Sequence, residues 1–185
     1  MLSTRVVDDQ QISGNTFGLF IAYTLPGLTA IYGLPLAMTS TSGWTTILAT
    51  SNPTVVDFII IVFQATTVGL IVSSVRGLTL DALHHRTGLR PPAWNFAILD
   101  HSVAVLELLI QIHYRYYKFY ANMVVALLWS LATGGWSLGW KQNVCYLLLI
   151  GLFFVASRDA LRKYYERTTS LFRPNPTREV KPAWA

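Results

Sequence analysis

Three histidines and two aspartates in the middle of the chain could form a metal site. Asp81, His84 and His85 follow one another at helical spacing, so on a helix they share one face. Asp100 and His101 come after the turn-forming segment RTGLRPP and could fold back towards them. Imidazole nitrogens and carboxylate oxygens are ligands of zinc, iron and manganese. The spacing matches neither HExxH nor paired ExxH, and hydrogen bonding at a membrane interface explains the same residues, so we predict no bound metal and no cofactor.

A second set of polar side chains lies on the stretch from Trp94 to Thr133, which contains no proline and no glycine and is typical of one long helix or two helices in line. At about 100° per residue these side chains fall within roughly 60° of one line, and we call them the polar row. The polar row consists of Asp100, Glu107, Gln111, Tyr114, Arg115, Lys118 and Asn122. It leads into a segment that is apolar all round, 123–131. The polar row could line a pore or a reaction cleft, or it could be a solvated or ion-paired face.

A third set is basic and lies near the C-terminus, beside Tyr164 and Tyr165. Its members are Arg162, Lys163, Arg167 and Arg173. Cations next to aromatic rings could bind anionic lipid, or the phosphates of a nucleotide partner. Basic residues at a cytoplasmic membrane face also explain the net charge of +5 without nucleic acid. The partners we predict are the lipid bilayer, further copies of the chain, and a cytoplasmic protein or nucleotide at this helix.

The composition indicates a membrane protein. Of 185 residues, 52% are hydrophobic and 12% are charged, whereas charged residues make up about a quarter of a typical soluble domain. Cys145 is the only cysteine, which excludes a disulfide within the chain and a zinc site built from cysteines. The sequence has no GxSxG, no CxxC and no glycine-rich phosphate loop, so no motif of nucleophilic catalysis indicates an enzyme.

Four segments are long and apolar enough to be transmembrane helices, at about 16–38, 54–75, 119–133 and 143–157. The first contains Pro26, Pro35 and three glycines, so we expect it to be kinked or broken, with its freed backbone groups facing protein or water. We expect Asp57 to cap the second helix. The segment 76–92 is expected to turn the chain back, and the proline-rich tail 173–185 to be extended.

The distribution of basic residues predicts the orientation. Thirteen of the 14 Lys and Arg residues lie in the N-terminal segment, in 76–118 or after 157, and Lys141 alone lies in the opposite loops. The positive-inside rule then places both termini in the cytoplasm. Residues 1–15 are polar and unlike a signal peptide, so they are expected to be a cytoplasmic N-terminal segment. The predicted fold is an all-α, multi-pass inner-membrane bundle over 16–172, with four transmembrane helices and cytoplasmic helical extensions.

Three functions are compatible with these features. The first is a homo-oligomeric ion channel or membrane effector in which the polar row lines the pore, because four spans are too few to enclose a pore alone. The second is a structural subunit or assembly factor of a larger membrane complex. The third is a membrane enzyme that uses the aspartate and histidine residues on a lipid or a small apolar substrate. The missing catalytic motifs favour the first two.

Overall fold

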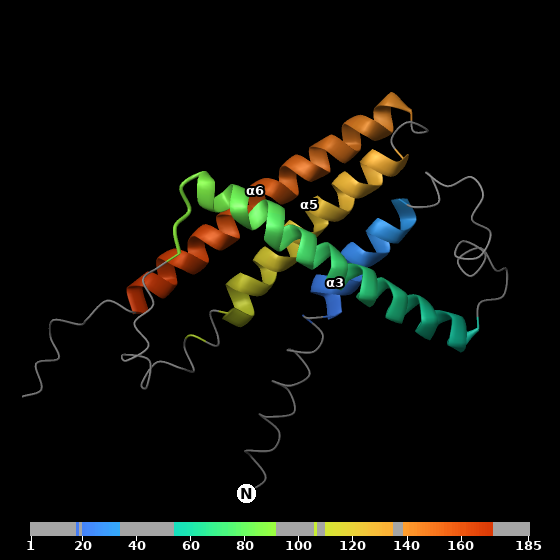
Figure 1. Ribbon diagram of the computed structural model, residues 1–185, viewed down its shortest axis with the longest axis horizontal. Helices are drawn as coiled ribbons and strands as arrows, with labels where there is room; N and C mark the ends of the chain where they lie inside the picture. The colour runs from blue at the N-terminus through green and yellow to red at the C-terminus, as the bar shows by residue number, and fades with distance from the viewer. Residues whose placement is uncertain are drawn as a thin grey trace, which may run out of the picture.

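The structure is a computed structural model, which describes residues 20–33, 54–91, 110–134 and 139–171, together with Gly18 and Leu106. The described part of the chain is helical and contains no strand. It comprises a helix at 20–33, α3 (Val55–Arg86), the π-helical turn η2 (Ile110–Tyr114), α5 (Arg115–Gly134) and α6 (Trp140–Leu171). Helices α5 and α6 lie side by side, α3 runs across them, and the helix 20–33 contacts both α3 and α5 (Figure 1).

Helix α3 begins at a capping box. The hydroxyl of Thr54 accepts a hydrogen bond from the backbone N–H of Asp57 at 3.2 Å, and the carboxylate of Asp57 accepts one from the N–H of Thr54 at 2.9 Å. These two bonds satisfy backbone donors that the first helical turn leaves free. The expectation that Asp57 caps this helix is confirmed, with Thr54 as its partner.

The same helix ends later than the sequence suggested. It continues past the predicted span to Arg86 and stops at Gly88, whose φ of 99° suits a residue without a side chain. The N–H of Leu89 donates to the carbonyl of His84 at 3.2 Å and that of Gly88 to His85 at 3.3 Å, the bonds of a Schellman motif. The chain therefore turns back after Arg86, and the prediction that 76–92 as a whole is a turn is wrong.

Residues 20–33 form one uninterrupted helix that contains Pro26. The predicted break is therefore wrong at Pro26, while Pro35 lies outside the described residues. Proline has no N–H, so Pro26 leaves the carbonyl of Ala22, four residues earlier, without its helical donor. Asn122 of α5 donates its side-chain N–H to that carbonyl at 3.0 Å. The expectation that the freed backbone group faces protein is confirmed.

The polar row crosses a change of helix type. Residues 110–114 form a π-helix before α5 starts at Arg115, and a π turn holds more residues than the 3.6 of an α turn. A helical wheel with a fixed step per residue therefore does not carry across this point. Whether the members of the polar row before 110 share a face with those after 114 stays a prediction, because Asp100 and Glu107 lie outside the described residues.

Helices α3 and α6 are both long and apolar enough to cross a membrane, each with 32 residues. Few residues of their apolar windows are buried against the rest of the chain, and large side chains such as Phe63 and Leu148 are mostly exposed. A core helix of a soluble protein would bury these side chains, so the pattern indicates association with a membrane. The predicted spans 16–38 and 119–133 coincide with the helix 20–33 and with α5, and their crossing of the membrane remains a prediction.

Candidate functional site

The buried face of α3 places a charged side chain in the middle of the bundle. Its buried residues succeed one another by three or four positions, as one face of a helix requires. They are Ala65, Gly69, Val72, Arg76, Leu80 and His84. The first three are small or apolar. The second half of the same line places a guanidinium and an imidazole where α3 meets α5 and α6.

Arg76 is only 6% exposed, and its charge is balanced by two neighbours. Its Nε lies 3.7 Å from Oδ1 of Asp81, and its guanidinium lies over the ring of Tyr117, 5.3 Å from the centroid. The hydroxyl of Tyr117 donates a short hydrogen bond to the same carboxylate oxygen. A carboxylate and an aromatic face together compensate a cation that burial would otherwise destabilise.

His84 is fully buried, and its described contacts favour one tautomer. The single hydroxyl proton of Ser157 is donated to the carbonyl of Phe154 at 2.8 Å, so Oγ of Ser157 must accept from Nε2 of His84 at 3.2 Å. Nδ1 of His84 is buried and has no hydrogen-bond partner among the described residues. These described contacts favour the neutral Nε2–H tautomer of His84, because a proton on Nδ1 has no partner among them. In this arrangement His84 does not act as a base towards Ser157.

Two further contacts fasten the end of α3 to α6. Arg158 donates from Nη1 to the hydroxyl of Thr87 at 2.6 Å and from Nη2 to its carbonyl at 2.9 Å. Nε2 of His85 lies 3.1 Å from the hydroxyl of Tyr165, and the two rings stack. A cation at a helix C-terminus is favourable because the last carbonyls carry partial negative charge.

We call the core of this region the boundary cluster: Arg76, Asp81, His84, Tyr117 and Ser157. Arg76, Tyr117 and Ser157 lie within two residues of the predicted inner ends of the second, third and fourth spans, at 75, 119 and 157. The predicted ends of three spans, each derived separately from the sequence, thus lie close together in the structure.

The residues proposed as a metal site do not converge in the described chain. Asp81 is bonded to Tyr117, His84 to Ser157 and His85 to Tyr165, so they face three different partners. The described ranges contain no group of three side chains that could hold a metal ion. Asp100 and His101 lie outside the described residues, so the interpretation of these five residues stays a prediction.

The polar row is described only in its second half. Tyr114 packs against the rings of Tyr117 and Tyr164, and Nζ of Lys118 lies 4.8 Å from the centroid of the Tyr114 ring. The side chain of Arg115 lies against Gly18, and Asn122 is fully buried on Ala22. These members all contact their own chain. Asp100, Glu107 and the side chain of Gln111 lie outside the described residues, so a role of the polar row in a pore stays a prediction.

The basic set on α6 lies near the start of α5. Arg162 pairs with Glu166, and Lys163 with Asp159, each at 2.7 Å on the exposed side of the helix. Burial, together with the positive charges of Arg167 and Lys163, lowers the pKa of the His113 imidazole. Arg173 lies outside the described residues. The described members remain candidates for contact with anionic groups, since exposed ion pairs are weak and exchange easily.

Sequence reasoning missed Arg76, Tyr117 and Ser157 as members of a site. Arg76 follows Val72 by four positions and so continues the buried face of α3, but it was assigned to a turn. Ser157 carried no signal of its own, because its role depends on His84, 73 positions away. Comparison of the chain with protein-family models, curated proteins and solved structures found no match.

Proposed function

We propose that the chain is a four-span inner-membrane protein with both termini in the cytoplasm. Two observations support this. Large apolar side chains of α3 and α6 are exposed. Of the ten Lys and Arg residues in the described ranges, nine lie in the segments 76–118 and 158–167, which meet at the boundary cluster, and Lys141 lies at the far end of α6. A basic end beside an apolar bundle fits the cytoplasmic leaflet.

Within the membrane, the function that the geometry supports best is that of a structural subunit or assembly factor of a larger membrane complex. The observation that carries this proposal is the direction of the polar side chains. Arg76, His84 and Asn122 are buried and contact other helices of the same chain. Such contacts fix the positions of the helices relative to one another. The broad apolar faces of α3 and α6 are then available to lipid and to neighbouring subunits.

A homo-oligomeric ion channel is the second candidate. The half-buried position of Lys118 supports it, because a lysine beside an apolar segment is costly to expose to lipid and is expected to face protein or water. Rings of this lysine and of Asp100 and Glu107 would require several copies around an axis. The contact of Lys118 with Tyr114 inside one chain supports the structural role instead.

Reconstitution in liposomes separates the two candidates. Ion flux is measured for the wild type, for Lys118→Met and for Asn122→Leu, and each variant is also melted in detergent. A structural subunit gives no flux above protein-free liposomes, while Asn122→Leu lowers the melting temperature. Flux that changes in Lys118→Met at an unchanged melting temperature would overturn the structural proposal in favour of the channel. A tag after Ala185 that can be labelled from outside the cell would overturn the proposed topology.

A further inference from the structure

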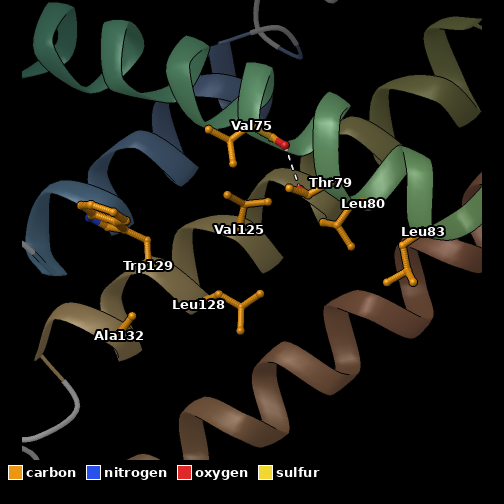
Figure 2. Close-up of a pocket in the computed structure, with 8 residues that line it drawn as sticks. All are labelled: Val75, Thr79, Leu80, Leu83, Val125, Leu128, Trp129 and Ala132. Carbon is orange, nitrogen blue, oxygen red and sulfur yellow. Dashed lines mark hydrogen bonds between the residues drawn. The ribbon is translucent and has the colours of Figure 1, made fainter.

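An apolar groove lies open between α3 and α5 (Figure 2). Its volume is about 430 Å³, and its walls include Val75, Leu83, Leu128 and Ala132. Thr79 also faces it, but its hydroxyl donates to the carbonyl of Val75 at 2.8 Å and offers no free donor. A smaller hollow of about 200 Å³ shares the walls Val75 and Trp129 and extends along α3 towards Val68. Because they share these side chains, the two apolar hollows adjoin along α3.

The groove is a path lined by apolar side chains. Its wall on α3 runs from Val75 to Leu83, about 12 Å at 1.5 Å per residue. A thin, flexible hydrocarbon chain fits such a path, and the volume is within the range of pockets for small apolar ligands.

The groove leads to positive charge at one end. Thr79, Leu83 and Arg86 are four and three positions apart on the uninterrupted helix α3, so they share one face. Arg86 is exposed in the last turn of that helix. Arg158 binds the next residue, Thr87, and adds a second cation at this end. An apolar path that ends at cations complements a molecule with a hydrocarbon chain and an anionic head.

We propose that the groove binds one acyl chain of an anionic phospholipid, with the lipid phosphate at Arg86. This inference depends on the membrane location proposed above. The groove is lined at its far end by Leu128 and Ala132, within the predicted third span, while Arg86 lies beyond the predicted inner end of the second. The lipid head would thus lie at the basic end of the bundle, and the acyl chain would extend along the groove past the middle of the third span.

The test compares phosphatidylglycerol with phosphatidylcholine of the same acyl chains. Membrane-extracted full-length protein is incubated with each lipid in detergent, and the lipid retained per chain is measured by native mass spectrometry. We expect phosphatidylglycerol to be retained about five-fold better, since one Arg near an anionic surface contributes an effect of that order. Arg86→Gln should abolish the preference, whereas Arg167→Gln, also exposed on the basic end, should keep it.

The apolar part of the site has its own matched pair of variants. Leu128→Trp fills the groove and should reduce retention of both lipids, whereas Leu148→Trp, on an exposed face of α6 outside the groove, should not. Ala132→Leu is a milder filling variant, and melting curves show that each variant is folded. Equal retention of the two lipids, equal loss in Arg86→Gln and Arg167→Gln, or equal behaviour of the two Trp variants would overturn the proposal. Recovery of the protein in the soluble fraction would instead overturn the membrane location.

Discussion

The two halves of the described bundle bury polar groups in opposite ways. The segments 20–33, 55–75 and 119–134 form the half that the proposed topology places away from the cytoplasm, and we call it the outer half. Its buried polar side chains are neutral and mostly bind backbone oxygen. Asn122 donates to the carbonyl of Ala22, and Ser130 donates to that of Thr29 at 2.8 Å. In the boundary cluster a buried cation, Arg76, lies beside the half-buried carboxylate of Asp81, and both contact other side chains.

This difference follows the cost of burying charge. A neutral amide or hydroxyl can be satisfied by one carbonyl, so it can lie deep in an apolar bundle. An ion pair loses much more solvation energy and is tolerated where part of it still reaches water, as the side chain of Asp81 does at 27% exposure. The outer half should therefore be sensitive to shape and single hydrogen bonds, and the boundary cluster to the loss of charge balance.

The largest expected effect is in the boundary cluster. Asp81→Asn keeps an acceptor for Tyr117 but leaves the buried guanidinium of Arg76 without its carboxylate. We expect the free energy of unfolding to fall by about 3 kcal/mol, the lower end for a broken buried pair because Asp81 is partly exposed. This free energy can be measured by denaturant titration in mixed micelles.

The control is Asp159→Asn, which breaks the exposed pair with Lys163. It should change the free energy of unfolding by about 0.5 kcal/mol or less. Similar losses in both would contradict the distinction between the two halves.

The next effect tests close packing in the outer half. A Cβ on Gly27 would lie 1.8 Å from the carbonyl oxygen of Ala65, so the two helices must separate in Gly27→Ala. We expect a loss of about 1–3 kcal/mol, seen as a lower melting temperature. Among the described residues, nothing lies within 4 Å of the corresponding position at Gly77 and Gly151, so Ala there should be neutral or stabilise by up to about 1 kcal/mol. A stable Gly27→Ala variant would show that the helices do not approach this closely.

The sequence predicted the helical segments better than the contacts between them. Hydropathy and the basic residues located the apolar parts of α3 and α6 and the segments that meet at the boundary cluster, because these signals are local. The contact of Asn122 with Ala22 joins residues 100 positions apart, and no local pattern encodes it. It depends on Pro26, which freed the carbonyl. The π-helical turn at 110–114 was also missed, since the wheel assumes a constant helical step.

The third prediction concerns the contact of Asn122 with the carbonyl of Ala22. Asn122→Leu removes the donor to the carbonyl of Ala22 and should lower the free energy of unfolding by about 1–2 kcal/mol. Pro26→Ala restores a backbone N–H to the same carbonyl. In the Pro26→Ala background, Asn122→Leu should therefore be milder by about 1 kcal/mol, as a double-mutant cycle would measure. Strictly additive effects would mean that Asn122 does not replace the bond that Pro26 removes.

The smallest expected effect concerns the C-terminal end of α3. It tests whether Arg158 stabilises this end through its two hydrogen bonds or through its charge alone. Arg158 binds Thr87 through two nitrogens, and a lysine keeps the charge but not the planar pair of donors. If the directed bonds hold the end of α3, Arg158→Lys and Arg158→Gln should each lose about 0.5–1 kcal/mol of stability, with little change on adding salt. If charge alone is sufficient, Arg158→Lys should be as stable as the wild type, and the stability of Arg158→Gln should approach that of the wild type as salt rises.

The free energy of unfolding of the three proteins at low and high salt decides between the two explanations. An Arg158→Lys variant as stable as the wild type would show that the two hydrogen bonds to Thr87 are not required. We expect the two variants to resemble each other, because Thr87 presents its hydroxyl and its carbonyl to the same guanidinium.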